Sequence, residues 1–489
     1  MKRILVMLAA LVIVAIPVAV PIALFVTKEE ASCYPKRNGS MMCYTEHPSD
    51  QHRWYATKTD YAYLTGLNDT NASEYTIPGC QPVMLYMYAR HSVRFPDFVD
   101  LVNMSEILHR VRNWTLEAAD QGKTKLCKKD IEELRHWEQR YKFNDAAQET
   151  RQGSTDTSMI AERFKKMFPS LFPPVYSDQD YKLGYSDRER TNQTLQAFLQ
   201  VIFDKEELSK IEYPPGDIEL VSFHKNCERK LWPNHTKPKR ELFEEPEKFR
   251  RSLIVQRFLR NLQTTLGIED KELSYHEANL IAIECALSYA AYGKSPWCAV
   301  FSNDDLLVSE YDDDIYDFYK DGYGRPLNPK MGCPVVNEVT QLFNDAANKP
   351  KEHHYKSVLY FTHSRDFKKL LGSFDLFIGD DRLTAVCMLF SDGYCTKEVR
   401  NRIWRDSTFS PYSAQLVFIL FQCGETYKVL SLLNEKPVKL PRCAYHANDF
   451  LCDLREFYSK YRVKNCDINK ICTPSAIYEK WPDTHWEDA

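Results

Sequence analysis

The feature that most constrains this chain is the stretch from Met84 to Pro96, which reads MLYMYARHSVRFP. An unbroken apolar and aromatic run of this kind is typical of a strand buried on both faces. The run stops abruptly at Arg90, His91 and Arg94. Ligands of open α/β sheets bind at the carboxyl ends of the strands, so these three side chains are candidates for a site.

The spacing of these residues suits an anion. Guanidinium groups form bidentate hydrogen bonds with phosphate oxygens, and an imidazole nitrogen can attack phosphorus or donate a hydrogen bond. Such a short motif also fits a surface cluster at a strand end. A second buried-type strand, at 357–362, ends on His363. Two such strands side by side would bring both histidines into one crevice.

Arg190 lies where a loop enters a helix with apolar positions at Leu195, Phe198, Leu199 and Ile202. Anions are favoured at helix amino termini, and the guanidinium would add to that field. A salt-bridged arginine at a helix start is the alternative interpretation. Two more apolar runs, 416–421 and 429–433, predict a β-hairpin at the sheet.

Length and charge exclude several classes of protein. The 489 residues suffice for one large domain with an insertion, or for two or three smaller domains. With 44% hydrophobic residues the chain is typical of a globular protein. A net charge of -4 argues against general nucleic-acid binding, which needs a basic surface.

The amino terminus predicts export. Lys2 and Arg3 precede an uncharged run from Ile4 to Val26, the layout of a signal peptide or of a signal anchor that would tether the protein to a membrane. Either one predicts the secretory pathway, with the body luminal or extracellular. Glycosylation motifs of the form Asn-x-Ser/Thr agree, and begin at Asn38, Asn68, Asn71, Asn103, Asn113, Asn192 and Asn234.

Fifteen cysteines without a Cys-x-x-Cys pair indicate disulfides rather than a metal site. The candidates are the close pair Cys33 and Cys43, and a late group of four: Cys443, Cys452, Cys466 and Cys472. No metal or cofactor is expected, and no protein partner can be identified from the sequence.

The middle of the chain is predicted to be helical. Ser274 and Glu277 form a capping box, and Gly293 with Pro296 ends that helix. An acidic run, Asp312, Asp313, Asp314 and Asp317, lacks the spacing of a calcium loop and is interpreted as a charge cluster at a helix start. The basic segment 225–251 fits either a polyanion pocket or a solvated face.

From about Cys80 to Tyr461 the chain resembles the histidine acid phosphatases, and within them the multiple inositol polyphosphate phosphatases. Besides the Arg-His-x-x-Arg core, the resemblance rests on segments that are typical of this branch: KSPWCAVF (294–301), YKDGYG (319–324), PYSAQLVFIL (411–420) and LLNEKPVKLP (432–441).

The resemblance implies an α/β fold, a three-layer sandwich with a mostly parallel central sheet and an inserted helical cap. The expected division is a leader at 1–30, an irregular glycosylated segment at 31–78, the α/β domain at 79–200 and 286–475, the cap at 201–285 and a tail at 476–489.

It also implies hydrolysis of phosphate monoesters, with inositol polyphosphates as the substrate class, in two steps through a phosphohistidine. His91 would be the nucleophile and His363 a further donor, while Arg90, Arg94 and Arg190 would hold the phosphoryl oxygens. Three arginines supply the positive charge that phosphoryl transfer needs without a metal.

Two positions depart from the family pattern. Ser92 replaces a glycine that follows the nucleophile. Arg365 replaces the glutamate that protonates the leaving group, and a guanidinium cannot donate that proton. Arg365 is therefore expected to bind substrate phosphates, and Asp366 is the possible substitute acid although it should point elsewhere. The alternative function is an impaired pseudophosphatase that binds polyphosphate anions without turning them over.

Overall fold

The computed structural model describes residues 43–46, 51–62, 75–216, 219–231, 243–379, 382–385, 399, 401–445, 449–476 and 479. The predicted leader lies outside these residues. Within them, no helix combines the length and the apolar character needed to cross a membrane.

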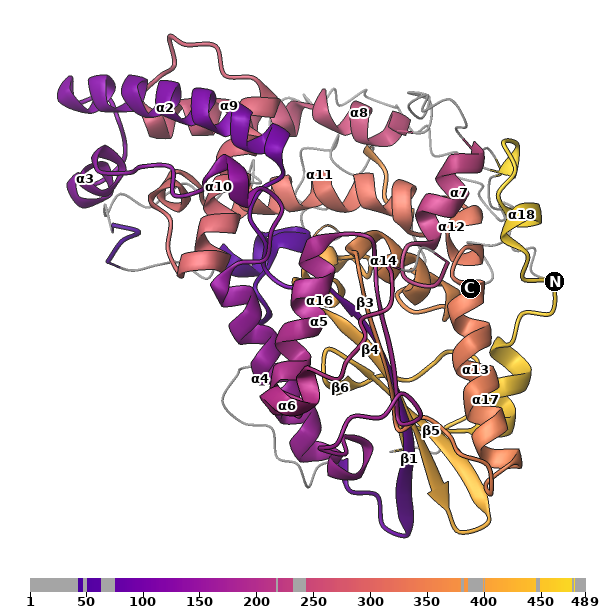
Figure 1. Ribbon diagram of the computed structural model, residues 1–489. Coiled ribbons are helices and arrows are strands. Elements are labelled where there is room, and N and C mark those ends of the chain that lie inside the picture. The colour runs from indigo at the N-terminus through magenta and orange to yellow at the C-terminus, as the bar shows by residue number, and fades with distance from the viewer. Residues whose placement is uncertain are drawn as a thin grey trace, which may run out of the picture.

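A single mixed sheet forms the centre of the molecule (Figure 1). Its strands run in the order β2-β3-β1-β4-β5-β6, and β7 pairs with β5. The bounds are β1 Cys80–Arg90, β2 Tyr181–Tyr185, β3 Ser357–Thr362, β4 Gln415–Cys423, β5 Thr426–Leu433, β6 Lys436–Pro437 and β7 Leu451–Asp453.

The α/β class is confirmed, but the sheet is not mostly parallel. Only β2, β3 and β1 run parallel to one another, whereas β4 pairs antiparallel with β1 and the pairings of β5, β6 and β7 are also antiparallel. The reason lies in the predicted hairpin of β4 and β5, which is present and adds to the free edge of β1. Short hairpin connections can join only antiparallel strands.

Helices cover both faces of the sheet. Their bounds are α2 Phe98–Asp120, α3 Lys128–Arg135, α4 Arg151–Met167, α5 Glu189–Ile202, α6 Lys205–Leu208, α7 Phe223–Leu231, α8 Glu244–Arg250, α9 Leu253–Leu266, α10 Tyr275–Tyr292, α11 Asn303–Asp321, α12 Leu327–Lys330, α13 Cys333–Asn348, α14 Ser364–Ser373, α16 Asp406–Phe409, α17 Leu454–Tyr461 and α18 Ile468–Ile471.

The alternation of side chains along β1 explains the three layers. Tyr86 and Tyr88 face one core, which α13, α14 and α17 complete. Leu85 and Met87 face a second core with α4 and α5 on the opposite side. Successive residues of a strand point to opposite faces, so a strand that is apolar at every position needs helices on both. Figure 1 shows these two helical layers on either side of the sheet.

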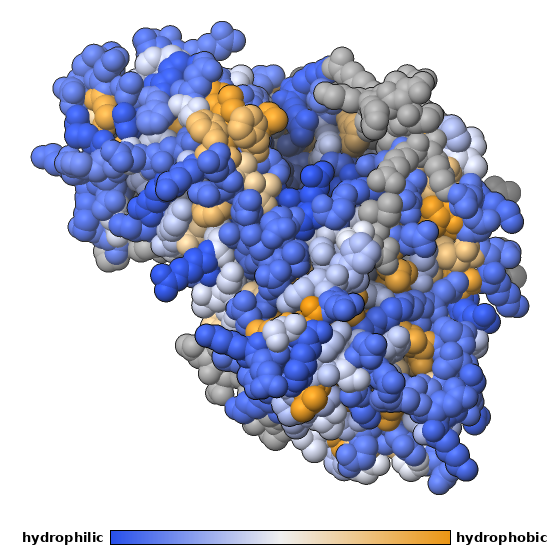
Figure 2. Space-filling view, viewed as in Figure 1, coloured by the Kyte–Doolittle hydropathy of each residue, from blue (hydrophilic) through white to orange (hydrophobic). Residues whose placement is uncertain are grey.

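A helical lobe stands beside this sandwich. In Figure 1, α2 and α3 lie with α9 and α10 in this lobe, and Arg110 of α2 is ion-paired with Glu277 of α10. The lobe thus takes helices from two stretches of the chain, and the predicted cap boundaries at 201–285 stay a prediction. On the face seen in Figure 2, hydrophilic side chains predominate, and the surface is hollowed next to this lobe.

The sequence signals for the two ends of α10 are confirmed, but the signal for the start of α11 is not. The capping box of Ser274 and Glu277 forms, and Gly293 ends α10 with a left-handed φ of 74°. The interpretation of the acidic run as a helix start is wrong, because α11 begins at Asn303 with its own capping box from Ser302 and Asp305. The aspartates lie farther along α11, where they pair with cations from other segments, such as Lys58 with Asp313.

Six disulfides cross-link the described residues: Cys43–Cys127, Cys80–Cys423, Cys227–Cys472, Cys285–Cys298, Cys333–Cys466 and Cys443–Cys452. The suggested pairing of Cys33 with Cys43 is wrong, since Cys43 is bonded to Cys127. All four late cysteines are bonded, although Cys466 and Cys472 reach back to α13 and α7. This number of bridges is consistent with an extracellular or luminal location.

Candidate active site

The parallel pairing of β1 with β3 brings the two histidines together. Arg90 is the register partner of Thr362, so His91 and His363 follow their strands at the same edge of the sheet. Their ring centroids are 5.4 Å apart. Both residues are more than nine-tenths buried, so this pair lies in a largely dehydrated region, which we call the recess.

The backbone fixes the orientation of the His91 ring. Nδ1 lies 2.9 Å from the carbonyl oxygen of Ser92. A carbonyl only accepts hydrogen bonds, so Nδ1 must carry the proton. The lone pair then belongs to Nε2, the nitrogen that is left for attack on an electrophile.

Ser92 does not point its side chain at the histidines. Its hydroxyl donates to the carboxylate of Glu149 and lies 3.5 Å from the Thr194 hydroxyl. Gly153 leaves room for this arrangement, since a Cβ there would stand 2.5 Å from the Ser92 oxygen. Burial raises the pKa of Glu149 to about 7. The serine that replaces the family glycine therefore directs its side chain toward Glu149 and Thr194.

The third parallel strand supplies Arg190. β2 pairs with β3, and the loop after β2 leads into α5, whose second residue is Arg190. A guanidinium nitrogen of Arg190 lies 3.4 Å from Nδ1 of His363. The other ring nitrogen of His363 lies 2.7 Å from the Ser186 hydroxyl. An arginine cannot accept a hydrogen bond, so Nδ1 is the acceptor and Nε2 carries the proton.

Arg90, at the end of β1, is buried. Its guanidinium carbon stands 4.6 Å from the centroid of the Tyr412 ring, and it donates to the Ser410 carbonyl at 2.8 Å. Arg94 is more exposed and pairs with Asp97 at 3.0 Å. The Nε atoms of Arg90 and Arg190 are buried and have no hydrogen-bond partner in the described part of the chain. Unused donors of this kind can bind an incoming anion.

The pKa shifts of the side chains in the recess also favour a bound anion. Burial, with further contributions from Arg190 and Arg90, lowers the pKa of His91 well below its usual value. Burial and the charge of Arg190 do the same to the pKa of His363. Burial also lowers the pKa values of Arg90 and Arg190 to about 10. All four groups would be stabilised in their charged forms by a bound dianion.

Comparison with known proteins identifies the family. The sequence pattern of the histidine phosphatase superfamily (branch 2) matches residues 84–436. The chain belongs to this superfamily. The Drosophila melanogaster protein named multiple inositol polyphosphate phosphatase 1 is 25% identical over 436 residues, covering 86% of this chain and 87% of the relative. The human protein of the same name is 26% identical over 420 residues, covering 80% and 82%.

Solved structures of the superfamily share the fold. The phytase from D. castellii superimposes with a TM-score of 0.64 at 17% identity, covering 88% of this chain and 91% of that chain. The multiple inositol polyphosphate phosphatase of Bifidobacterium longum gives a TM-score of 0.62 at 14% identity, covering 82% and 96%. The resemblance inferred from the sequence motifs is confirmed.

Two predicted site residues face elsewhere. Arg365 donates to Glu228 of α7 at 2.5 Å and to Asp321 of α11 at 3.1 Å. Asp366 is fully buried, and its carboxylate accepts hydrogen bonds from His224 and lies 3.3 Å from the Thr362 hydroxyl. The structure thus brings together His91, His363 and the three other arginines but not these two side chains.

Sequence reasoning missed Tyr412, Glu149 and His224. Tyr412 lies 6.2 Å from His91 between ring centroids, just before β4, and only the pairing of β4 with β1 puts it there. Its place in the segment PYSAQLVFIL, which carried the resemblance, was the available signal. Neither Glu149 nor His224 belongs to any motif of the chain.

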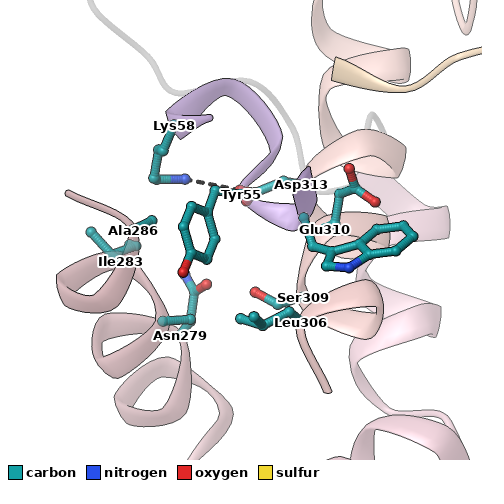
Figure 3. Close-up of a pocket in the computed structure, with 11 residues that line it drawn as sticks. Tyr55, Lys58, Asn279, Ile283, Ala286, Leu306, Ser309, Glu310 and Asp313 are labelled. Carbon is teal, nitrogen blue, oxygen red and sulfur yellow. Dashed lines mark hydrogen bonds and ion pairs between the residues drawn. The ribbon is translucent and has the colours of Figure 1, made fainter. Parts of the chain in front are cut away.

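A second hollow lies between α10, α11 and the short 3-10 helix η3 Ala56–Lys58 (Figure 3). Lys58 and Asp313 both line it and form an ion pair at 2.9 Å, and Tyr55 and Asn279 are further lining residues. Its one lysine is already neutralised by a carboxylate. This hollow is therefore a poorer candidate for a polyanion than the recess at His91.

Proposed function

We propose that this chain hydrolyses inositol polyphosphates at the recess of His91, through a phosphohistidine intermediate. The observation that carries the proposal is the meeting of two histidines and two incompletely bonded arginines at the ends of three parallel strands. Phosphoryl transfer asks chiefly for positioning and for positive charge around the equatorial oxygens. Both are present here.

The relatives support the substrate class. The two phosphatases from Drosophila and human are named for inositol polyphosphates. The Bifidobacterium longum enzyme was crystallised with inositol hexasulfate and also with phosphate. We assign the same class of substrate to this chain. The signal peptide or anchor at residues 1–30 would deliver the enzyme to the secretory pathway.

In the first step, Nε2 of His91 attacks phosphorus and the bond from phosphorus to the ester oxygen breaks. The Ser92 carbonyl holds the ring and accepts from Nδ1–H as positive charge develops on it. Arg90, Arg94 and Arg190 are assigned to the phosphoryl oxygens. Such donors are worth most where water is excluded, as in this buried recess.

In the second step, water attacks the phosphohistidine, which releases inorganic phosphate and restores His91. His363 has two assigned roles. Its Nδ1 accepts from Arg190 and holds that side chain in place. A bound dianion would raise the pKa of its ring, and the protonated ring would then donate to a phosphoryl oxygen.

The proposal is tested with the full chain and inositol hexakisphosphate. We expect wild-type protein to release inorganic phosphate and His91→Ala to lose at least about 10³-fold of that activity, because both ring nitrogens of the other histidine, His363, are engaged by Ser186 and Arg190. His136→Ala is the matched control, since that side chain is 72% exposed on the surface. Equal release by wild type and His91→Ala would overturn the hydrolase.

A pseudophosphatase is the second candidate, favoured by one observation: Arg365 occupies the place of the family acid and is held in two ion pairs. It predicts binding of inositol hexasulfate by calorimetry, lost in Arg190→Met, without phosphate release. Turnover above the His91→Ala background would exclude it.

A further inference from the structure

The leaving group of the proposed reaction needs a proton, and neither of the two side chains expected at that position can supply it directly. Arg365 is a permanent cation held by Glu228 and Asp321. Asp366 has no exposed surface, and each of its carboxylate oxygens already accepts a hydrogen bond.

Asp366 instead forms hydrogen bonds with a histidine. One carboxylate oxygen accepts the backbone N–H of His224 at 3.0 Å, and the other lies 2.6 Å from Nδ1 of the same residue. The Thr362 hydroxyl lies 3.3 Å from the second oxygen. A carboxylate at this distance accepts the proton of Nδ1 and fixes the orientation of the ring. Proton exchange is then left to Nε2, which makes no hydrogen bond within the described residues.

The segment that carries His224 crosses the carboxyl ends of β1 and β3. The Tyr88 hydroxyl of β1 donates to the Leu220 carbonyl at 2.8 Å, and the Thr362 hydroxyl of β3 donates to the Val221 carbonyl at 2.6 Å. His224 follows in the first turn of α7 and is 5% exposed. Two hydrogen bonds and a disulfide three residues later, at Cys227, hold it beside the strand ends that carry His91 and His363.

The charges around His224 come from three elements. On α14, Asp366 faces it and Arg365 is one residue away. On α7, Lys225 pairs with Asp187 of the loop after β2, and Glu228 pairs with Arg365. Across the recess, the charge of His224 is among the causes that lower the pKa of His363. The two rings are therefore within electrostatic reach of each other.

We propose that His224, positioned by Asp366, is the general acid that protonates the leaving inositol oxygen. This inference rests on the proposed function. As the bond from phosphorus to the ester oxygen breaks and the bond to Nε2 of His91 forms, the Nε2 proton of the His224 imidazolium passes to the departing oxygen. In the second step, neutral His224 takes a proton from the attacking water, which restores both histidines.

The test compares leaving groups. When inositol hexakisphosphate loses a phosphoryl group, the leaving group is an inositol alkoxide that needs a proton, whereas nitrophenolate departs from 4-nitrophenyl phosphate without one. We expect His224→Gln to lower kcat/KM for inositol hexakisphosphate about 10²- to 10³-fold and for 4-nitrophenyl phosphate less than about 10-fold. His136→Gln is the surface control. A merely structural role of His224 would lower both activities by the same factor, and that result would overturn the inference.

Asp366→Asn adds a readout that does not depend on His224→Gln folding well. Loss of the carboxylate charge should lower kcat/KM for inositol hexakisphosphate more than for 4-nitrophenyl phosphate, because the ring of His224 is then held less firmly. An equal loss with both substrates would count against the pairing of Asp366 with His224. If wild-type protein released phosphate from neither substrate, the proposed function itself would fail.

Discussion

Two groups of buried cations in this molecule have opposite surroundings. Arg90 and Arg190 in the recess lie beside neutral rings and hydroxyls, and each has a buried Nε without a hydrogen-bond partner. The second group, which we call the ionic cluster, joins four cations, Arg365, Lys368, Lys369 and Arg402, to carboxylates of α11.

The pKa shifts of Arg190 in the recess and Arg402 in the ionic cluster run in opposite directions. In the recess, burial lowers the pKa of Arg190 to about 10. Burial also acts against the charge of Arg402, but Asp314 and Glu310 outweigh it and raise the pKa of that guanidinium. A cation that serves the fold is neutralised by the protein's own anions. The recess lacks that neutralisation, which is what a site for an external dianion requires.

The largest effect is expected from breaking the ionic cluster. Arg402 is 4% exposed, and its guanidinium donates to Asp314 at 2.7 Å and to Glu310 at 2.8 Å. Arg402→Met would leave two buried carboxylates short of a partner, at a cost of about 3–5 kcal/mol in the free energy of unfolding. Denaturant titration measures this. Arg135→Met, at a surface pair with Asp120, should cost less than about 1 kcal/mol.

The reverse outcome is expected in the recess. Arg190→Met should lower kcat/KM for inositol hexakisphosphate by about 10²-fold or more, roughly 3 kcal/mol, while the melting temperature stays level or rises because a desolvated charge is removed. Inorganic phosphate should stabilise wild type against heat but not this variant. Arg188→Met, at an exposed position two residues earlier, is the control. If Arg190→Met lost as much stability as Arg402→Met, the proposed difference between cations that stabilise the fold and cations that bind substrate would be wrong.

The smallest effect concerns a buried acid that forms no ion pair with the described residues. Glu284 accepts from Ser288 at 2.7 Å through one oxygen, while the other lacks a partner. Burial raises its pKa from 4.5 to about 7. The folded protein therefore binds a proton that the unfolded chain releases between these values, so stability falls as pH rises through this window.

Glu284→Gln should remove that loss. Wild type is expected to lose on the order of 2 kcal/mol more than the variant between pH 5 and pH 7. Comparing the two unfolding curves at each pH cancels the contribution of the other titrating groups. Parallel pH dependence in the two proteins would show that Glu284 is ionised throughout.

The sequence was most informative where a local pattern determines position. The apolar runs before His91 and His363 predicted two buried strands, and parallel strands end at the same edge, so the pairing of the histidines followed. The helical spacing after Arg190 likewise located that residue at a helix start.

Local sequence patterns could not predict which side chains of distant segments contact each other. Asp366 was expected to point away from the position of the family acid, and it does, but its partner His224 lies 142 residues earlier in the chain. The same holds for Arg365, whose partner Glu228 lies 137 residues away. No spacing rule connects such residues, because their meeting depends on how α7 packs against α14.

The bridge between Cys227 and Cys472 has a consequence for biosynthesis. It joins α7 to α18, 245 residues later. During translation, Cys227 leaves the ribosome 245 residues ahead of Cys472. The covalent hold on α7 can thus form only after Cys472 has also been made. A nascent product ending before α18 would contain every arginine of the recess but not the bond that secures His224.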